Sequence, residues 1–335
     1  MPEKVAILGA GSWGMAISRL LHNNGMSVTL WEFDRQDYEK LRRLRGRPDK
    51  LKGFILPETI TVTNDLSEAI SGSRFIALVV PSQSLRSVLR RLHGMLDPEV
   101  CLISLAKGIE TKTLKRMSEV IAEEFPPLQE RTVTLSGPSH AEEVIVDMPT
   151  AVVAAGCNNN LVARVQEAFS SRSFRVYKSN DLIGVELGGS LKNITAIAAG
   201  IVCGLGMGDN TKGAIITRGL AEITRLGVAL GAQAETFAGL SGIGDLITTC
   251  TSQYSRNRYV GERIGQGHRL DDILAGMHMV AEGVETTRSG YKLASVHNVE
   301  MPITKEVFSI LFEGKPPSAA VEELMGRELK AEIWR

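Results

Sequence analysis

Three glycines near the N-terminus constrain the fold of this chain more than any other feature. Gly9, Gly11 and Gly14 form a G-x-G-x-x-G pattern between the apolar run Lys4–Leu8 and the apolar-periodic stretch Gly14–Asn24. The run predicts a β-strand and the stretch an α-helix. In such a unit the first glycine permits a tight turn, the second lets a pyrophosphate approach the backbone, and the third lets the helix pack closely on the strand. The pattern therefore predicts a βα unit that binds a dinucleotide at the helix N-terminus; a glycine turn without a ligand is the alternative.

The remainder of the first half alternates short β-rich runs with longer helical ones. Most of these runs are continuous and apolar, which is typical of parallel strands covered on both faces. Strands that alternate with helices predict a doubly wound parallel sheet. The predicted strands after the first are Ser27–Glu32, Phe75–Val80, Val100–Leu105, Thr132–Leu135, Thr150–Ala155 and Phe174–Tyr177.

The second half contains long helical patterns and almost no β-branched runs. A chain of 335 residues favours two domains at about 100–200 residues per domain. The segment Ser179–Asp181 is typical of a helix N-cap and marks the boundary. We therefore expect an α/β fold with a Rossmann-like doubly wound sheet in residues 1–179, followed by an all-α C-terminal domain in residues 180–335. Its predicted helices are Leu182–Gly204, Thr211–Leu230, Arg258–Gly265, Leu270–Ala275, Glu285–His297, Ile303–Phe312 and Pro317–Arg327.

The end of the second predicted strand bears on the choice of cofactor. Glu32 stands about 20 positions after the glycines, where an acidic residue accepts a hydrogen bond from the ribose 2′-hydroxyl and repels a 2′-phosphate. Glu32 therefore favours NAD, whereas Arg35 and the arginines of the basic stretch Lys40–Lys52 could accommodate NADP. Both cofactors stay open, with a slight preference for NAD, and a surface role for Glu32 is the alternative. The simplest interpretation of Lys40–Lys52 is a solvated helix end and loop.

Composition argues against several other classes of protein. Lys plus Arg and Asp plus Glu number 38 each, so the formal net charge is zero, which argues against nucleic-acid or membrane-surface binding. The N-terminal apolar run is too short for a signal peptide, and the most apolar stretch, Gly188–Gly208, favours a buried core helix over a membrane span. The four cysteines are scattered and the six histidines lack metal-ligand spacing, so we expect a reduced cytoplasmic compartment and no metal site.

Lys192 is the only charged residue in the stretch GGSLKNITAIAAGIVCGLG. A lysine is rarely buried without an anion, because its ammonium group must lose its water. The best candidate partner is Asp245, which Gly242 and Gly244 flank in a predicted tight turn. A lysine that reaches the surface is the alternative, and it would need no partner.

Three further segments favour an anionic ligand. Ser255–Arg258 (SRNR) places a hydroxyl, a guanidinium and an amide side by side, which suits a phosphate group. Two segments follow predicted strands, where a doubly wound sheet binds its ligand: SLAKGIE, with Lys107, and SGPSHAEEV, with Ser136, Gly137 and Ser139 before a predicted helix at Ala141. A polar helix start and solvated loops are the alternatives for these segments.

Together these segments resemble one family, the NAD(P)-dependent glycerol-3-phosphate dehydrogenases of the soluble bacterial type. The resemblance covers nearly the whole chain, from GAGSWG at Gly9 to LMGR at Leu324, and includes VVPSQ, AKGIE, SGPSHAEE, FRVY, GVELGGSLKNI, ITRGLAE, GIGDLITTCT and SRNR. It implies reversible oxidation of sn-glycerol 3-phosphate to dihydroxyacetone phosphate. The direction in the cell would be reduction, which supplies glycerol 3-phosphate for glycerophospholipid synthesis.

The resemblance also implies roles for individual residues. Lys192 matches the catalytic lysine, the proton acceptor and donor, and Asp245 orients it. The implied substrate contacts are Lys107, Gly137, Ser139, Lys192, Asn193, Asp245, Thr249, Ser255, Arg256 and Asn257. The candidate cofactor contacts, including those from the glycine pattern, are Gly9, Gly11, Ser12, Trp13, Gly14, Glu32, Phe33, Lys107, Ala141, Arg256, Val280 and Glu282.

One departure from the family pattern concerns the cofactor. Phe33 stands where some members place a polar or basic residue, and Glu32 where some bacterial relatives have a small one. This combination weakens an NADP assignment.

The pKa of Lys192 decides whether it can act as a base. A lysine with an ordinary pKa near ~10.4 is a poor base at neutral pH. The apolar surroundings of Lys192 should lower its pKa and Asp245 should raise it, and the sequence does not say which effect prevails.

Two rival functions follow from the same pattern. Other dehydrogenases with a helical second domain, such as hydroxyacid or 6-phosphogluconate dehydrogenases, share the architecture. A redox sensor would bind the dinucleotide without needing Lys192, Asp245 or a phosphate receptor. The resemblance leaves the oligomeric state open, although enzymes of this kind are often homodimers.

Overall fold

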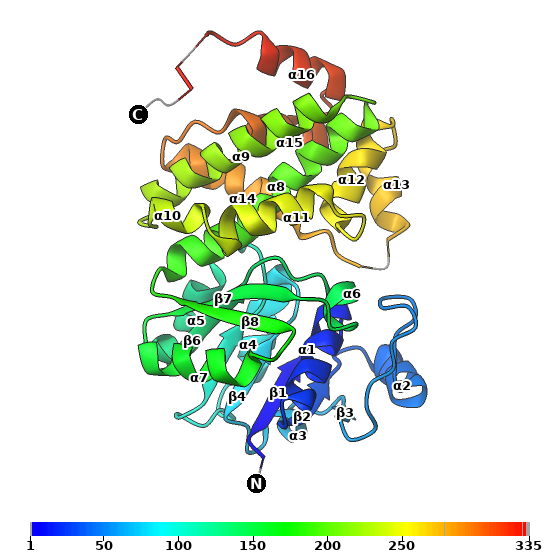
Figure 1. Cartoon of the computed structure of the whole chain (residues 1–335), viewed down its shortest axis with the longest axis vertical. Coiled ribbons are helices and arrows are strands. Elements are labelled where there is room, and N and C mark those ends of the chain that lie inside the picture. Colours follow the sequence, from blue (N-terminus) through cyan, green and yellow to red (C-terminus); the bar gives the residue numbers. More distant parts are fainter. Residues whose placement is uncertain (1, 278, 330, 333–335) are drawn as a thin grey trace.

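The computed structural model describes residues 2–277, 279–329 and 331–332. A sheet covered by helices forms one end of the molecule, and a group of helices forms the other (Figure 1). The last strand ends at Ser179 and the first helix of the second group begins at Leu182. Asp181 caps that helix, since its Oδ1 accepts a hydrogen bond from the Gly184 backbone N–H at 2.9 Å, so the expected N-cap is confirmed.

Eight strands form one sheet in the order β3-β2-β1-β4-β5-β6-β7-β8. The order places β1 inside the sheet between β2 and β4, as in doubly wound folds, and the predicted fold class is confirmed. The strands are β1 (Lys4–Leu8), β2 (Ser27–Trp31), β3 (Thr61–Thr63), β4 (Phe75–Leu78), β5 (Cys101–Ser104), β6 (Thr132–Ser136), β7 (Thr150–Gly156) and β8 (Phe174–Ser179).

Two features of the sheet differ from the prediction. β7 runs antiparallel to β6, because the connection between them contains only the short helix α6 (Ala141–Val144), which does not carry the chain back across the sheet. The edge strand β3 was not predicted, since its sequence, TVT, is short and lacks the apolar run that indicates a buried strand.

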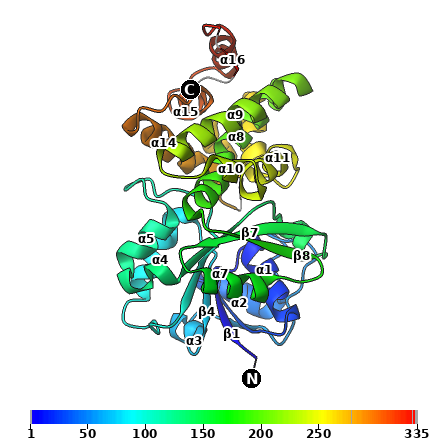
Figure 2. The ribbon, with the colours of Figure 1, turned by 60° about the vertical axis from the view of Figure 1, so that its left-hand side comes forward.

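Helices cover both faces of the sheet, as Figure 2 shows with α4 and α5 on one side and α7 on the other. Alternate residues of β1 separate the two packing layers: Val5 and Ile7 contact one set of helices, and Ala6 and Leu8 the other. The helices of this part, apart from α6, are α1 (Ser12–Asn23), α2 (Arg35–Leu44), α3 (Leu66–Ile70), α4 (Leu85–Arg91), α5 (Met117–Glu124) and α7 (Asn159–Phe169), with short 3-10 turns η1 (Ser82–Ser84) and η2 (Pro126–Arg131).

The second part is built around α8 (Leu182–Gly204), in which every residue from Gly184 to Val202 is buried. The other helices of this part contribute to one continuous apolar core around it. They are α9 (Asp209–Ala229), α10 (Ala234–Phe237), η3 (Leu240–Gly244), α11 (Asp245–Thr251), α12 (Arg256–Gly265), α13 (Leu270–Ala275), α14 (Glu282–Val296), α15 (Pro302–Phe312) and α16 (Pro317–Met325). Among these, α10, η3 and α11 were not predicted; the others match the predicted helices to within a few residues at each end.

The length and hydropathy of α8 would also suit a membrane-spanning helix. It is the one such helix among the described residues, and 89% of its most apolar window is buried inside the protein. That burial is what a core helix requires, and it agrees with the interpretation made from the sequence.

Helices α8 and α12 approach each other closely enough for their backbones to touch. A Cβ atom at Gly200 would overlap the carbonyl oxygen of Arg258, and one at Gly261 would overlap that of Ile197. Glycines at these positions therefore bring the two helix axes together. This contact holds the N-terminus of α12 at a fixed place beside the middle of α8.

Candidate active site

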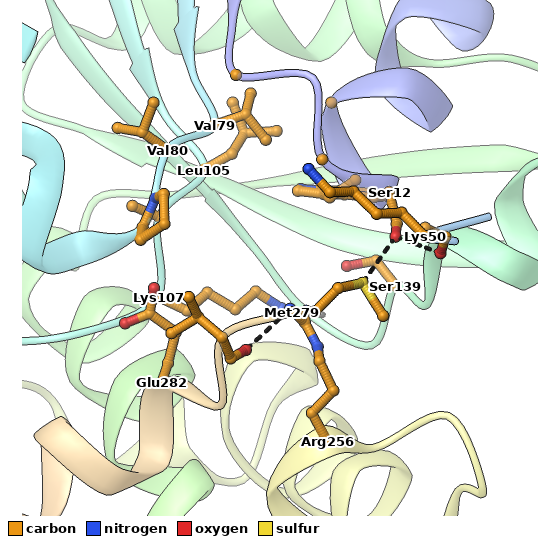
Figure 3. Close-up of a pocket in the computed structure, with 18 of the residues that line it drawn as sticks. Ser12, Lys50, Val79, Val80, Leu105, Lys107, Ser139, Arg256, Met279 and Glu282 are labelled. Atoms are coloured by element: carbon orange, nitrogen blue, oxygen red, sulfur yellow. Dashed lines mark hydrogen bonds between the residues drawn. The ribbon is translucent and has the colours of Figure 1, made fainter. Parts of the chain in front are cut away.

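A cavity of about 560 Å³ lies between the two parts of the molecule (Figure 3). It adjoins the C-terminal ends of the central strands and the N-termini of α1, α12 and α14, where an open α/β sheet binds its ligands. With the exception of Gly137, every residue among the implied substrate contacts and the candidate cofactor contacts lines this cavity. The lining residues of that set are Gly9, Gly11, Ser12, Trp13, Gly14, Glu32, Phe33, Lys107, Ser139, Ala141, Lys192, Asn193, Asp245, Thr249, Ser255, Arg256, Asn257, Val280 and Glu282. Ser136 and Arg35, which the sequence also offered as ligand-binding residues, do not line the cavity.

Lys192 lies in the middle of α8 and is 5% exposed. Its ammonium group donates to Asp245 Oδ1 at 2.6 Å and to Thr249 Oγ1 at 2.5 Å. The Thr249 hydroxyl gives its own proton to the Asp245 backbone carbonyl at 2.6 Å, so its oxygen is free to accept from Lys192. These contacts use two of the three N–H positions of Lys192 and leave the third for a ligand in the cavity.

Asp245 also binds a second lysine. Lys107 Nζ donates to Asp245 Oδ2 at 2.8 Å and to the Gly137 carbonyl at 2.8 Å. Gly137 does not line the cavity, but its backbone carbonyl helps to hold the Lys107 side chain in place. The predicted Lys192–Asp245 pair is present, and the sequence did not indicate that Lys107 would share the same carboxylate.

The surroundings of Lys192 lower its pKa to about 8. Burial is the largest cause, because it disfavours the charged amine; Asp245 opposes this effect and Lys107 adds to it. The pKa of Asp245 lies below its usual value, since the two neighbouring ammonium groups outweigh the effect of burial. The structure thus gives a lysine that can exchange a proton near neutral pH beside a carboxylate that stays ionised.

The local structure around Asp245 differs from the predicted tight turn. Asp245 is the first residue of α11 and follows the π-helical turn η3, in which Gly242 has non-helical backbone angles. A Cβ at Gly188 of α8 would come within 2.5 Å of the Ser241 carbonyl oxygen. Because glycine stands at this crossing, η3 lies directly against α8 and directs the Asp245 carboxylate toward Lys192.

The glycine pattern forms the expected turn between β1 and α1. Gly9 has a φ of 120°, which favours glycine, and a Cβ at Gly14 would overlap the Gly9 carbonyl oxygen. A Cβ at Gly11 would meet nothing within 4 Å, because Gly11 faces the cavity. This open space in front of the α1 N-terminus suits a pyrophosphate, so the residues present fit a dinucleotide.

The N-terminus of α12 presents several hydrogen-bond donors to the same cavity. Ser255 is the N-cap, and its oxygen accepts from the Arg258 backbone N–H at 3.2 Å. Asn257 Oδ1 accepts from the Gly283 N–H at 2.9 Å, which leaves its amide N–H₂ group to donate elsewhere. Arg256 Nη1 donates to the Val280 carbonyl at 3.0 Å and keeps its other donors. A helix N-terminus with these side chains is well suited to an anion.

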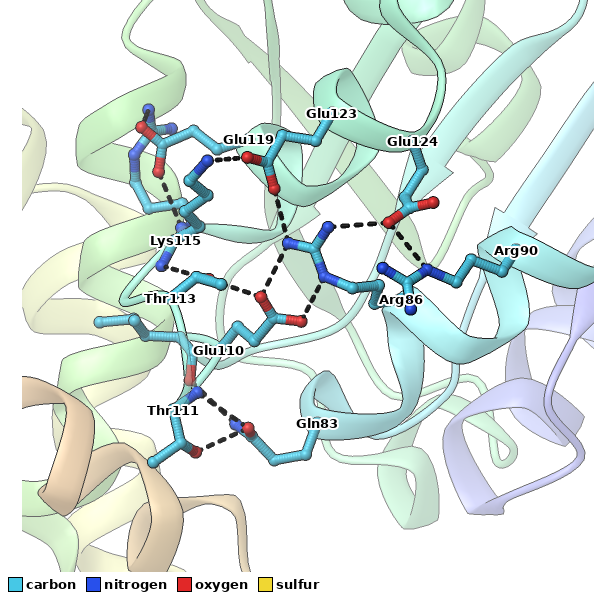
Figure 4. Close-up of polar contacts among 12 residues, drawn as sticks. Gln83, Arg86, Arg90, Glu110, Thr111, Thr113, Lys115, Glu119, Glu123 and Glu124 are labelled. Atoms are coloured by element: carbon cyan, nitrogen blue, oxygen red, sulfur yellow. Dashed lines mark hydrogen bonds and ion pairs between the residues drawn. The ribbon is translucent and has the colours of Figure 1, made fainter. Parts of the chain in front are cut away.

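The loop that carries Lys107 is fixed from several sides, as Figure 4 shows. Arg86 of α4 binds both oxygens of Glu110 at 2.8 Å each and also contacts Glu123 and Glu124 of α5. Within the loop, the Ile109 carbonyl accepts from the Gln83 side chain at 2.8 Å. Contacts of this kind limit how far the loop, and with it Lys107, can move.

Glu282 connects the same loop region to the second part. Its carboxylate accepts from the Ser82 backbone N–H at 2.9 Å and from the Ser82 hydroxyl. A Cβ at Gly108 would overlap Ser82 Oγ, so the glycine allows the Lys107 loop to pass close to this contact. Glu282 therefore lines the cavity while it holds α14 to the first part.

Comparison with known proteins places this chain in a family. The model for the NAD-dependent glycerol-3-phosphate dehydrogenase N-terminus matches residues 4–162, and the model for the C-terminus of the same family matches residues 181–322. The chain belongs to this family. It is 51% identical over 335 residues to "Glycerol-3-phosphate dehydrogenase [NAD(P)+]" of Geobacter sulfurreducens, covering 100% of both chains, and 52% identical over 330 residues to the protein of the same name from Thermoanaerobacter sp., covering 98% of this chain and 99% of that one.

Solved structures agree with this family assignment. A crystal structure of glycerol-3-phosphate dehydrogenase from Coxiella burnetii superimposes with a TM-score of 0.93 at 38% identity, covering 97% of this chain and 99% of that one. Membership of the family makes this chain an NAD(P)-dependent oxidoreductase. The resemblance inferred from the sequence is confirmed, and so is the choice of NAD or NADP as cofactor class.

The structure also reveals cavity residues that sequence reasoning did not single out. Lys50, His140 and Met279 line the cavity, and burial lowers the pKa of His140 to about 4, so its imidazole is neutral. His140 lies in SGPSHAEEV, which the sequence indicates as a ligand-binding segment, but nothing in the pattern points to the histidine itself.

The interpretation of Lys40–Lys52 as a solvated helix end and loop is wrong for Arg47, which is 3% exposed.

Proposed function

We propose that this chain catalyses the reversible oxidation of sn-glycerol 3-phosphate to dihydroxyacetone phosphate, with Lys192 as the proton acceptor and donor. The observation that carries the proposal is the position of Lys192. It is a buried amine with a lowered pKa, and it shares one cavity with the glycine turn and the α12 N-terminus. We further propose that reduction is the direction used in the cell and that it supplies glycerol 3-phosphate for phospholipid synthesis.

The proposed proton transfer uses the third N–H position of Lys192. In the oxidative direction the neutral amine takes the proton of the C2 hydroxyl, and in the reductive direction the ammonium group donates it to the developing alkoxide. Asp245 and Thr249 hold the amine in one orientation through bonds of 2.6 and 2.5 Å. Lys107, Asn193 and Ser139 complete the wall around the reacting carbon in this proposal.

The substrate phosphate is assigned to the α12 N-terminus. Ser255, Arg256 and Asn257 offer hydroxyl, guanidinium and amide donors there, and the backbone contact with α8 fixes their place relative to Lys192. Binding a phosphate away from the reacting carbon orients the substrate and contributes to lowering the barrier.

The cofactor is assigned to the glycine turn. Gly9, Gly11 and Gly14 would accommodate the pyrophosphate, with Ser12, Trp13, Ala141, Val280 and Glu282 around the remainder. When bound, the nicotinamide accepts or supplies the hydride. The protein's part is to hold the reacting groups together and to exclude water from between them.

Replacement of Lys192 by methionine tests the assignment. Methionine fills similar space without a titratable amine, so the rate of dihydroxyacetone phosphate reduction should fall by about 10²–10⁴-fold. The affinity for NADH, measured by fluorescence, should stay near wild type. Lys212→Met, which removes a lysine paired with Asp209 on α9, is the matched control and should keep full activity.

Three outcomes separate the proposal from its rivals. Retained turnover in Lys192→Met would exclude Lys192 from the proton transfer. Cofactor binding by the wild type without turnover on dihydroxyacetone phosphate would favour a redox sensor. Turnover of a hydroxyacid or of 6-phosphogluconate instead would favour the other dehydrogenases of this architecture.

We also propose that residues 1–179 form the NAD(P)-binding domain and residues 180–335 the helical substrate-binding and catalytic domain, and that the enzyme acts in the cytoplasm as a homodimer. The cytoplasmic location rests on the scattered cysteines, and the homodimer rests on the family resemblance. Light scattering of the purified protein should give twice the mass of the 36.3 kDa chain.

A further inference from the structure

We infer that Arg86 is a positioning residue, which holds Lys107 at its place in the active site by binding Glu110. Through Lys107, Arg86 acts on the proton exchange of Lys192. The inference rests on the proposed role of Lys192. It concerns a residue outside the cavity, because Arg86 is not among the residues that line it.

The loop that carries Lys107 has little regular structure of its own. Residues 105–116, all of which the structure describes, contain no helix or strand, and an isolated β-bridge joins Ile109 to Arg116. The Glu110 N–H donates to the Lys115 carbonyl at 2.9 Å, which closes the far half of the loop into a turn. Backbone bonds therefore define the shape of this turn, and side-chain contacts must fix its place in the molecule.

Arg86 of α4 makes such a contact with both arms of its guanidinium group. Its Nε donates to Glu110 Oε1 and its Nη2 to Glu110 Oε2, each at 2.8 Å. Glu110 is 7% exposed, and the Thr113 hydroxyl donates to its Oε2 at 2.5 Å. A bidentate arginine–carboxylate contact fixes direction as well as distance, so it locates Glu110 relative to α4.

The guanidinium group of Arg86 is itself held in one orientation (Figure 4). Two carboxylates of α5 accept from it, Glu124 from Nη1 at 2.8 Å and Glu123 from Nη2 at 2.7 Å. The bond to Arg86 is the largest cause of a lowered pKa at Glu110, so Glu110 stays ionised at neutral pH. The contact between Arg86 and Glu110 is therefore a charged pair that two neighbouring helices support.

Glu110 lies three residues after Lys107, so a shift of one displaces the other. The Lys107 ammonium group donates to Asp245 Oδ2 and to the Gly137 carbonyl, each at 2.8 Å. Hydrogen bonds of this length weaken steeply when the donor and acceptor move apart. A loop released from Arg86 would therefore loosen the contact between Lys107 and Asp245.

Lys107 acts on Lys192 in two ways. Its positive charge lowers the pKa of Lys192 directly. It also occupies Asp245 Oδ2, whereas Lys192 binds Oδ1 at 2.6 Å. Displacement of Lys107 would move a cation away and leave the carboxylate to Lys192 alone. Both changes favour the ammonium form, so both raise the pKa of Lys192.

Arg86→Lys tests the inference, because it keeps the positive charge and removes the planar fork. The protonation of Lys192 is followed by NMR of protein labelled with ¹³C in its lysine side chains, and Lys192→Met identifies the signal. The wild-type midpoint should lie at about 8. In Arg86→Lys we expect it to rise by at least about 0.5 pH unit, and the pH profile of glycerol 3-phosphate oxidation should shift with it.

Two further variants show whether Arg86 acts through Lys107. Lys107→Met should raise the midpoint by itself, and adding Arg86→Lys to it should cause no further shift. Arg90→Lys is the matched control, since it replaces a guanidinium group of the same helix whose contact is with Glu124 at 3.2 Å. The control should keep the wild-type midpoint.

An unchanged midpoint in Arg86→Lys, or a further shift in the double variant, would overturn the inference. If Arg86→Lys does not fold, Glu110→Gln decides instead. Loss of its negative charge alone would lower the midpoint, so a rise indicates displacement of Lys107, and an unchanged or lowered midpoint would overturn the inference. The expected shifts in a protein that does not reduce dihydroxyacetone phosphate would support this inference and reject the proposed reaction. Turnover without the shifts would reject this inference alone.

Discussion

Lys192 shows how one residue obtains its chemistry from its surroundings. The same helix position with an ordinary lysine pKa would hold a permanent cation at neutral pH. Burial and Lys107 lower the pKa to about 8, and Asp245 limits the fall. Both proton states are therefore populated in the range in which the proposed reaction runs.

The pH dependence of the two directions should follow from this pKa. Oxidation needs the neutral amine, so its kcat/KM should rise with pH through a midpoint near about 8 and then level off. Reduction needs the ammonium form, so its kcat/KM should fall through the same midpoint. Because Asp245 raises the pKa of Lys192, Asp245→Asn should move the midpoint to lower pH. A midpoint that moved upward would contradict this account of the pair.

For single residues, the sequence predicts a partner only where a charge without a partner would be costly to bury. A lone lysine in an apolar run needs an anion, and Asp245, 53 residues away, could be predicted as that anion. That Lys107, 138 residues from Asp245, binds the other oxygen could not be predicted. Lys107 stood in a loop where solvent would satisfy it equally well, so no physical requirement indicated its partner.

In the turn between β1 and α1, different glycines have different structural roles. Gly14 lets α1 pack on the turn, since a Cβ there would overlap the Gly9 carbonyl, while Gly11 only keeps space open toward the cavity. Both tasks were predicted from the G-x-G-x-x-G spacing. The glycines of α8 and α12 were not interpreted as a contact, because small residues in one helix acquire meaning only when the partner helix is known.

Two alanine substitutions should separate these tasks. Gly14→Ala should lower the melting temperature by several degrees, because strain of about 1–3 kcal/mol must be absorbed by the α1–β1 contact. Gly11→Ala should melt near the wild-type temperature but bind NADH much more weakly, since the new methyl group enters the pyrophosphate space. Gly208→Ala, with no atom within 4 Å of the new methyl group, is the control for both measurements. Equal melting temperatures for the Gly14 and Gly11 variants would contradict the assignment.

At the scale of the whole molecule, buried polar contacts connect the two parts outside the cavity. Glu186 of α8 accepts from Arg116 at 2.5 Å, from the Ser118 N–H at 2.8 Å and from the Ser118 hydroxyl at 2.6 Å. The N-cap at Asp181 could be predicted because capping is local in sequence. These contacts could not, since a glutamate in an apolar helix gives no indication of which distant residues will meet it.

Loss of the Glu186 charge should weaken the connection between the parts. Glu186→Gln keeps the volume but places an amide donor among donors, so the free energy of unfolding in urea should fall by about 1–3 kcal/mol. Glu262→Gln breaks a surface pair with Arg258 and should cost no more than about 0.5 kcal/mol. The Glu186 variant should also reduce dihydroxyacetone phosphate more slowly, because the Lys107 loop ends at Arg116. A Glu186 variant as stable as the Glu262 control would show that other contacts hold the two parts together.

The backbone contact between α8 and α12 has a consequence for what the cavity accepts. One helix carries Lys192, the amine that we propose exchanges the proton, and the other begins with the donors that we propose bind the phosphate. Since the two backbones touch at Gly200 and Gly261, main-chain contacts fix where the α12 N-terminus lies relative to the part of α8 that carries Lys192. The fixed positions of the two helices therefore limit the length of a substrate that can contact both Lys192 and the α12 N-terminus. A phosphate ester one carbon longer than a triose would have to bend or leave one end unbound.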